Sequence, residues 1–157
     1  MSTKDFNQQL GSFLKASPTP FHAVKEMSSA LIAEDFISLS EASVWELESN
    51  KSYFVTRNDS SLIAFRIGSS NVVDSGIRML GAHTDSPCLK IKPEPDLGEK
   101  GYCQLGVEVY GGALLNPWFD RDLSIAGRVN YLDNNGKINS CLIDFIKPLA
   151  IIPSLAI

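Results

Sequence analysis

The stretch Gly81-Ala82-His83-Thr84-Asp85-Ser86-Pro87 is the centre of the fold that this sequence predicts. It follows an apolar run, Ile77–Leu80, which is interrupted only by Arg78 and predicts a buried strand. A glycine and a proline mark the ends of the stretch, so we expect a loop at the carboxyl end of that strand. Residues two positions apart on an extended chain point to the same face, so His83 and Asp85 are expected to project together. In open α/β folds, ligands bind beyond the carboxyl ends of such strands.

Two interpretations of this histidine and aspartate stay open. In the first, His83 is a metal ligand and Asp85 is the carboxylate that holds the other nitrogen of its imidazole ring. In the second, His83 is an ordinary loop histidine and Asp85 caps the following turn. The His-x-Asp pattern alone favours the second interpretation, because a catalytic zinc ion usually needs about three protein ligands.

The composition is typical of one globular domain with a substantial core: 157 residues, 44% of them hydrophobic, and a net charge of −4. The chain has no basic block, so nucleic acid is not an expected partner. It has no apolar run of about 18 residues, so no membrane-spanning helix is expected. The N-terminus is polar and predicts no signal peptide. Because the cysteines have no paired spacing, we expect reduced, partly buried thiols in a cytosolic protein: Cys88, Cys103 and Cys141.

The first third of the chain predicts two helices. Apolar residues recur at helical spacing from Lys4 to Lys15. After a break, Thr19 suits the N-cap of a second helix and Pro20 its first position. His22 falls in the first turn, where we expect a solvent-facing or capping histidine and not a metal ligand. The inner face of this helix is expected to contain Phe21, Val24, Met27 or Ser28, and Leu31.

The rest of the chain predicts strands. Ser52–Arg57 and Leu62–Ile67 flank a hairpin-type connection, and Leu89–Lys92 alternates like a half-exposed strand. Pro93–Asp96 is the best candidate for a domain boundary. Beyond it, alternation begins at Cys103, and an Asn-Gly step predicts a hairpin of the segments 125–132 and 137–145. An apolar run reaches the last residue, Ile157, and a sheet-forming run that stops there suggests a fragment with an uncovered edge.

Several blocks of the sequence carry a family resemblance: Ser17–Val24, Gly81–Pro87, Gly106–Gly112, Trp118–Leu123 and Ile152–Ile157. In this order they resemble the M18 family of metallo-aminopeptidases, which includes the aspartyl aminopeptidases. The closer likeness is to the bacterial members of the family. The blocks cover nearly the whole chain, which would be the N-terminal portion of such an enzyme.

The resemblance implies an α/β catalytic domain that is interrupted by an inserted β-rich dimerisation domain. Residues 1–95 would be the N-terminal part of the catalytic domain, and residues 96–157 the first, truncated part of the insertion. Self-association through the insertion and a peptide substrate are implied in the same way. The cytoplasmic location is expected from the unpaired cysteines.

The resemblance also implies roles for two residues. His83 matches a zinc ligand of the family, and Asp85 matches its catalytic aspartate. The remaining ligands, the glutamate general base and a further active-site histidine would follow Ile157. For the complete enzyme the resemblance implies a pair of zinc ions, roughly 3.5–4 Å apart as in two-metal aminopeptidases. The zinc would polarise a peptide carbonyl and activate water.

The remaining motifs have simpler interpretations. Asp120, Arg121 and Asp122 are expected to form a salt-bridged loop or a subunit contact. Trp118 and Phe119 are expected to be packing residues. The glycine pair at 111–112 follows a strand and does not open a helix, so it predicts a turn or bulge and not a phosphate site.

The function implied is therefore that of a zinc-dependent aminopeptidase that removes N-terminal residues from peptides. Some members of the family prefer acidic N-terminal residues and others prefer different ones, so the N-terminal residue that this enzyme would prefer stays open. The 157-residue chain alone is expected to be inactive, because it lacks most of the ligands. The alternative is a non-catalytic truncated product that self-associates through its β-rich half.

Overall fold

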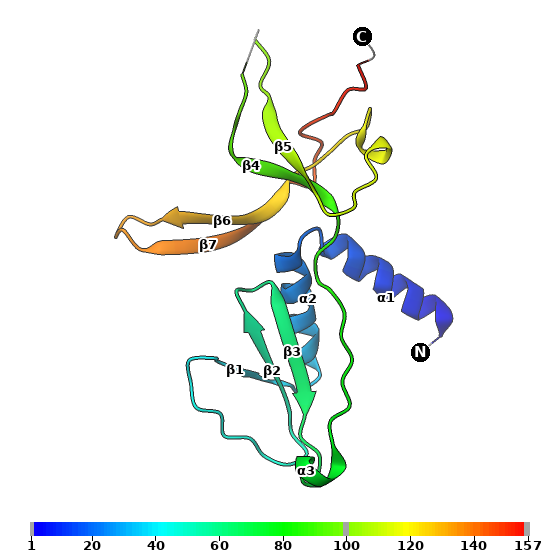
Figure 1. Ribbon diagram of the computed structural model, residues 1–157, viewed down its shortest axis with the longest axis vertical. Coiled ribbons are helices and arrows are strands. Elements are labelled where there is room, and N and C mark those ends of the chain that lie inside the picture. The colour runs from blue at the N-terminus through cyan, green and yellow to red at the C-terminus, as the bar shows by residue number, and fades with distance from the viewer. Residues whose placement is uncertain (1, 99–100, 156–157) are drawn as a thin grey trace. The chain divides into compact units, whose positions relative to one another are not determined.

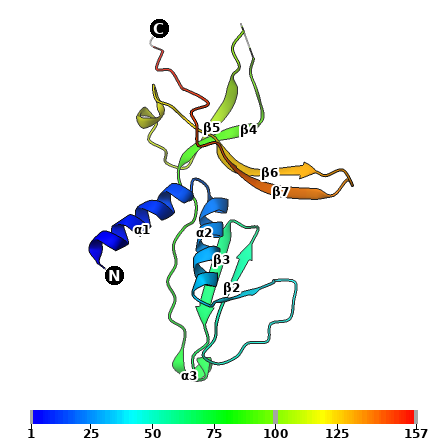
Figure 2. The ribbon, with the colours of Figure 1, turned by 180° about the vertical axis from the view of Figure 1, so that it is seen from behind.

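The computed structural model describes residues 2–98 and 101–155, and it combines helices with small sheets (Figures 1 and 2). This mixture of helix and strand confirms the predicted α/β character. The chain divides into two compact units. The first contains Met1–Thr84 and Ala126–Asp144, and the second contains Asp85–Ile125 and Phe145–Ile157. The predicted division into residues 1–95 and 96–157 concerns the domains of a longer protein and stays a prediction.

Both predicted helices are present, and both begin at their capping residues. Helix α1 spans Thr3–Ala16, and a capping box joins Ser2 and Asp5 at its start. Helix α2 spans Pro20–Ala33, with Thr19 as N-cap and a proline at its first position, as predicted. A short helix, α3, spans Val72–Ser75. No helix in the described parts of the chain is long and apolar enough to cross a membrane.

A three-stranded sheet lies beside helix α2 in the first unit (Figures 1 and 2). Strand β1, Ile37–Leu39, pairs in parallel with β2, Ser52–Arg57, and β2 pairs antiparallel with β3, Ser61–Arg66. The predicted β2–β3 hairpin is therefore confirmed. Its turn contains Asn58 and Asp59, both with a φ of 52°, a left-handed conformation that Asn and Asp tolerate better than most residues.

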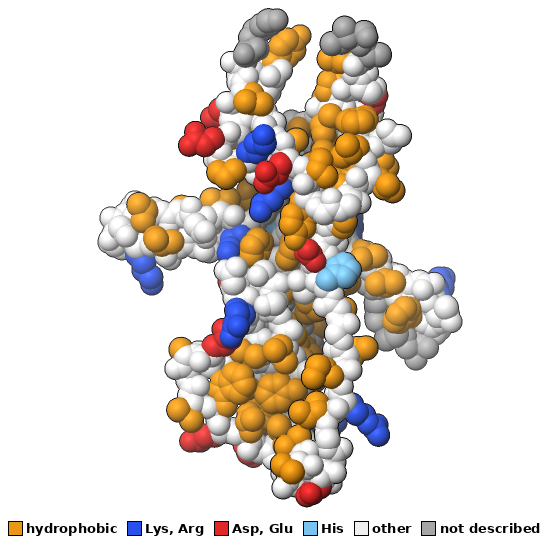
Figure 3. Space-filling view, in the orientation of Figure 1, with side chains coloured by type: hydrophobic (Ala, Val, Ile, Leu, Met, Phe, Trp, Pro, Cys, Tyr) orange, Lys and Arg blue, Asp and Glu red, His pale blue; other side chains and the backbone are white. Residues whose placement is uncertain are grey.

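The core of the first unit joins the start of α2 to strand β2. Ala23 and Val24 are buried on the helix, and three consecutive residues, Tyr53–Val55, are buried on the strand. Three consecutive buried residues on a strand require cover on both faces of the sheet, because side chains alternate. Aromatic stacking covers the face of Tyr53, whose ring lies 5.7 Å from that of Phe65 between centroids. Hydrophobic side chains remain exposed over this sheet (Figure 3).

His22 corrects one expectation. It is not solvent-facing, because only 9% of the residue is exposed. Its Nδ1 lies 2.7 Å from Oγ1 of Thr19, the residue that caps the same helix. Of the two expected roles, solvent-facing or capping, the capping role therefore agrees better with the structure. A buried imidazole needs a hydrogen-bond partner, and the N-cap hydroxyl provides it.

The second hairpin of the first unit consists of β6, Ala126–Leu132, and β7, Ile138–Asp144, which pair antiparallel as predicted. The Asp133 carboxylate accepts hydrogen bonds from the backbone N–H groups of Lys137 and Asn135 and from the Asn139 amide. These bonds lower the pKa of Asp133, the bond from Lys137 most. Gly136, with a φ of 74°, supplies the left-handed position of the turn.

Arg128 joins this hairpin to the rest of the first unit. Its Nη1 donates to the Asn58 carbonyl at 2.8 Å, and its Nη2 donates to Oδ1 of the same residue at 3.0 Å. The guanidinium carbon also lies 4.1 Å from the centre of the Phe21 ring on α2. Asp59 adds a longer ion pair at 3.8 Å. A planar guanidinium can stack on a ring and fork its hydrogen bonds at the same time, which a lysine cannot do.

We therefore expect Arg128→Ala to loosen the β6–β7 hairpin. The lost cation–π contact and charged hydrogen bonds should lower the free energy of opening by about 1–2 kcal/mol. Hydrogen exchange of the β6 and β7 amides measures this opening. Arg128→Lys should recover less than half of the loss, and Arg66→Ala, at an exposed position on β3, serves as the control. Unchanged exchange in Arg128→Ala would show that the hairpin does not depend on this contact.

The second unit is built on strands β4, Cys88–Asp96, and β5, Leu105–Tyr110, which pair antiparallel. Lys90 and Lys92 on β4 are exposed while their apolar neighbours are half-buried, as the predicted alternation requires. The predicted boundary segment, Pro93–Asp96, lies within β4, where the register shifts between Ile91 and Asp96. Prolines cannot donate to a ladder of hydrogen bonds, which explains an irregularity at this point.

The segment that contains the charged cluster Asp120–Asp122 is held by a later part of the chain, residues 150–154, which pairs with it. It contains a short 3-10 helix, η1, at Asn116–Trp118, and isolated bridges join Phe119 to Ile152 and Leu123 to Ala150. The Asp120 carboxylate accepts hydrogen bonds from the backbone N–H and the hydroxyl of Ser154. These bonds, the one from the hydroxyl most, lower the pKa of Asp120. Among the residues described, no ion pair joins Asp120, Arg121 and Asp122, so the expected salt-bridged loop was wrong, while a subunit contact stays a prediction.

The apolar run before the central loop corrects a larger expectation. Residues 77–80 form no strand, and Ile77, Met79 and Leu80 are 74%, 88% and 100% exposed. A buried strand needs hydrogen-bonded neighbours and a layer over each face. None of the sheets in the described residues includes this run. The expected position of the central loop, at the carboxyl end of a buried strand, was therefore wrong as well.

The cysteines match their prediction only in part. All three thiols are free. Cys88 is partly buried, as expected, but Cys103 and Cys141 are exposed, because they lie on segments that the described chain does not cover. The predicted end of the chain within a strand, at Ile157, lies outside the described residues.

Candidate active site

The central loop, residues 81–87, lies immediately before strand β4 and has no regular secondary structure. His83 is exposed and Asp85 is half-buried. His83 belongs to the first compact unit and Asp85 to the second.

In the first unit, the loop is held beside His83 by its neighbour Thr84. The Thr84 hydroxyl donates a hydrogen bond of 2.8 Å to the carbonyl of Ser60, in the turn between β2 and β3. This bond anchors the backbone next to the histidine to the three-stranded sheet. The imidazole itself reaches the surface, as a group that is to bind a ligand from solution must do.

In the second unit, Asp85 is held by Tyr110, the last residue of β5. The phenol hydroxyl donates to Oδ2 of Asp85 at 2.6 Å, which is the length of a charge-assisted O–H···O⁻ hydrogen bond. This bond, together with the negative charge of Asp85, raises the pKa of Tyr110 above its usual value of 10.0. The phenol therefore remains a donor throughout the neutral range.

The residues after Asp85 and after Tyr110 also meet. Cys88 at the start of β4 pairs with Tyr110 at the end of β5. Gly111 follows with a φ of 68°, and a Cβ atom placed on it would lie 3.6 Å from Pro87. That distance is ordinary van der Waals contact, so the left-handed backbone is what favours glycine here. The chain bends at residues 111 and 112, where the glycine pair predicts a turn or bulge.

The residues that the structure describes do not complete a zinc site. Imidazole nitrogen and carboxylate oxygen both suit zinc, but a catalytic site uses about three protein ligands. Among the described residues, no group of three His, Cys, Asp or Glu side chains is placed to hold a metal ion. The chain has only two histidines, and the second, His22, is paired with the N-cap of α2. A complete set of ligands therefore needs groups beyond those described.

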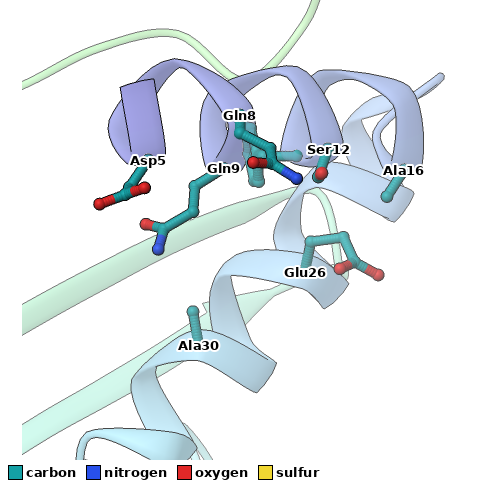
Figure 4. Close-up of a pocket in the computed structure, with 8 residues that line it drawn as sticks. Asp5, Gln8, Gln9, Ser12, Ala16, Glu26 and Ala30 are labelled. Carbon is teal, nitrogen blue, oxygen red and sulfur yellow. The ribbon is translucent and has the colours of Figure 1, made fainter. Parts of the chain in front are cut away.

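A hollow in the first unit lies elsewhere. A groove of about 690 Å³ runs between helices α1 and α2 (Figure 4). Its lining mixes polar and apolar residues and includes neither His83 nor Asp85: Asp5, Gln8, Gln9, Ser12, Phe13, Ala16, Glu26 and Ala30. The groove contains no histidine or cysteine and no arrangement of nucleophile and base, so it suggests no chemistry of its own.

Tyr110 is the residue of this region to which sequence reasoning assigned no role. It lies within the Gly106–Gly112 block, so the resemblance included it. Pairing the strand at 89–92 antiparallel with the strand ending near 109 would have brought it close to the central loop. The register that selects Cys88 as its partner depends on the bulge in β4, which the alternation does not show.

Comparisons with known proteins agree on one family. Residues 13–157 match the family model described as "Aminopeptidase I zinc metalloprotease (M18)". Two bacterial relatives are named "Probable M18 family aminopeptidase 2". The protein from Ectopseudomonas mendocina (strain ymp) is 59% identical over 150 residues, covering 96% of this chain and 35% of the relative. The protein from Pseudomonas fluorescens (strain Pf0-1) is 56% identical over 154 residues, covering 98% and 36%.

Solved structures give the same result. The structure of Chaetomium thermophilum mApe1 superposes with a TM-score of 0.88 at 38% identity, over 97% of this chain and 35% of that chain. The S. cerevisiae mApe1 dodecamer has a TM-score of 0.88 at 33% identity, over 96% and 36%. The chain thus spans about a third of the length of these relatives. Since the family model matches nearly all of its residues, the chain belongs to the M18 family of aminopeptidases.

Proposed function

We propose that this chain is part of a longer, zinc-dependent aminopeptidase that removes N-terminal residues from peptides. The observation that carries the proposal is the match of residues 13–157 to a zinc metalloprotease family. The identity of 59% with a probable M18 aminopeptidase supports it. Because the chain spans only 35% of that relative, the activity is that of the longer protein.

His83 and Asp85 are the residues proposed to serve the reaction. His83 is the metal ligand that this chain contributes, and Asp85 is a catalytic carboxylate. The anchoring of both neighbourhoods supports these roles, since a catalytic group must be held in a fixed orientation. Thr84 is bonded to Ser60 beside the histidine, and Tyr110 is bonded to the aspartate itself. The other metal ligands and the general base are proposed to lie in the two thirds of the relatives that this chain does not span.

The substrates are proposed to be peptides with a free N-terminus, and acidic N-terminal residues are the proposed preference. That preference comes from the likeness to aspartyl aminopeptidases. A panel of aminoacyl substrates that begins with Asp, Glu, Leu and Lys tests it directly. A higher kcat/KM for Leu or Lys would exclude the acidic preference without affecting the proposed reaction. The proposed location is the cytoplasm.

Substitution of the two site residues in a full-length protein tests the proposed roles. His83→Ala should lower both bound zinc and hydrolysis to background, because a ligand is lost. Asp85→Asn keeps the shape but removes the charge, so hydrolysis should fall by about 10–100-fold while zinc is partly retained. Metal analysis and steady-state kinetics measure both effects.

Matched controls separate these roles from general damage. His22→Asn removes the other histidine and should leave zinc content unchanged. Asp35→Asn alters an exposed aspartate with a φ of 60°, which asparagine tolerates, and should leave the kinetics unchanged. Full zinc content in His83→Ala would exclude His83 as a ligand, and wild-type turnover in Asp85→Asn would remove Asp85 from the mechanism.

A second candidate function is self-association without catalysis. The incomplete set of metal ligands in the described residues favours it for the chain alone. A relative of similar fold has been solved as a dodecamer, which supports self-association. The β-rich residues 96–157 are the proposed surface for it. Sedimentation velocity of the purified chain over a range of concentrations tests this function, and a monomer at every concentration would exclude it.

A further inference from the structure

The hydrogen bond between Tyr110 and Asp85 joins the central loop to the end of a strand. Tyr110 is the last residue of β5 and is paired with Cys88, three positions after Asp85. That pair belongs to a ladder that continues through Leu89, Lys90 and Ile91. Just beyond it, a Cβ atom placed on Gly111 would lie 3.6 Å from Pro87, so the chain after Tyr110 runs close to the central loop. The phenol therefore reaches Asp85 from a strand whose position is set by its ladder with β4.

We propose that Tyr110 is a positioning residue, whose hydroxyl holds the carboxylate of Asp85 in the orientation that catalysis requires. This inference rests on the proposed catalytic role of Asp85. A carboxylate can rotate about its Cβ–Cγ bond, and terminal torsions of this type are broad. One short hydrogen bond to Oδ2 removes that freedom and directs the other oxygen, Oδ1, along one line.

Stability is a weaker explanation for this bond. Asp85 is only half-buried, and 42% of Tyr110 is exposed. Water can therefore hydrate the carboxylate when the phenol is removed, and the penalty for an unsatisfied buried charge does not arise. A group that contributes little to folding but is bonded to a catalytic carboxylate acts mainly on orientation. Partners of this kind typically change activity by about 10–100-fold.

The test is Tyr110→Phe in a full-length protein that contains this chain. Phenylalanine keeps the ring, including its position 6.0 Å from the Lys90 ammonium, and removes only the hydroxyl. We expect kcat to fall by about tenfold with little change in KM, since the ground-state contacts of the substrate are not altered. Bound zinc and the melting temperature should stay within error of the wild-type values.

Tyr53→Phe is the matched control. The Tyr53 hydroxyl also has a defined partner, because it accepts a hydrogen bond of 2.9 Å from the Glu48 backbone N–H. Tyr53 is buried in the core, at 1% exposure, so losing this bond should lower stability. It should leave kcat unchanged. We therefore expect opposite patterns. Tyr110→Phe should lower kcat and leave the melting temperature unchanged, whereas Tyr53→Phe should lower the melting temperature and leave kcat unchanged.

A double-mutant cycle distinguishes positioning from an independent effect. If Tyr110 acts through Asp85, then adding Tyr110→Phe to Asp85→Asn should lower kcat no further. An additional tenfold loss in the double variant would overturn the proposal, as would a wild-type kcat in Tyr110→Phe alone. If Asp85→Asn itself keeps wild-type activity, the proposed function of Asp85 fails. If Asp85→Asn is impaired and Tyr110→Phe is not, only the positioning role fails.

Discussion

The purified 157-residue chain should bind no stoichiometric zinc and should hydrolyse no aminoacyl substrate. A catalytic zinc ion takes about three protein ligands held in fixed geometry. Among the described residues, no suitable group of three exists. A second copy of the chain would add only the same incomplete set. We expect this result although the chain belongs to a peptidase family, because it spans 35% of its relatives.

Equilibrium dialysis against zinc, followed by metal analysis, measures the first part of this prediction. The second part needs a sensitive assay with acidic and neutral aminoacyl substrates at matched zinc concentration. His83→Ala is the control, because weak binding by surface carboxylates would be the same in both proteins. One zinc ion per chain with turnover abolished by His83→Ala would contradict the prediction. It would show that the chain completes a site with groups that the described geometry does not bring together.

Local features of the fold could be predicted because they depend on neighbouring residues. Thr19 and Pro20 begin α2 through capping and a preset φ, and both effects act within a few residues. The β6–β7 turn is predicted in the same way, since Gly136 adopts a left-handed conformation that most residues resist. Hairpins and caps are therefore visible in the sequence itself.

Features that depend on distant residues could not be predicted. The apolar run at 77–80 has the composition of a buried strand, but composition does not say which layers will cover it. No sequence pattern indicated that Arg128 would stack on Phe21 and bind Asn58, a residue 70 positions away. Burial of His22 was missed for a related reason, because a first-turn position is exposed only until another element packs on it.

The same distinction between local and long-range features applies to the candidate site. The His-x-Asp pattern alone favoured an ordinary loop, and only the resemblance to a family assigned roles to His83 and Asp85. Their anchoring contacts came from the structure, since Thr84 binds Ser60 from 24 positions away and Tyr110 binds Asp85 from 25. Sequence patterns can therefore suggest which groups react, whereas the partners that orient those groups depend on strand register.

The last prediction concerns the core that supports the first unit. Phe54 lies at the centre of strand β2 and is only 2% exposed. Tyr53 and Val55 are buried on the opposite face of the same strand, so β2 is held between two packed layers and a cavity left by Phe54→Ala has little room to collapse. We expect the free energy of unfolding of this unit to fall by about 3–5 kcal/mol, which combines lost transfer energy with the cavity. Such a loss is a large fraction of the stability of an ordinary domain.

A local probe is needed because the chain has two units, each with a tryptophan. Trp45 stacks on Phe65 in the first unit, at 6.2 Å between ring centroids, and Trp118 lies in the second. In a Trp118→Phe background, fluorescence during urea unfolding therefore reports the first unit alone. Ile63→Ala, on the neighbouring strand and 66% exposed, is the control and should cost less than about 1 kcal/mol. Equal effects of the two substitutions would show that β2 is not the core of this unit. The burial of three consecutive β2 residues predicts instead that Phe54→Ala will be by far the more damaging change.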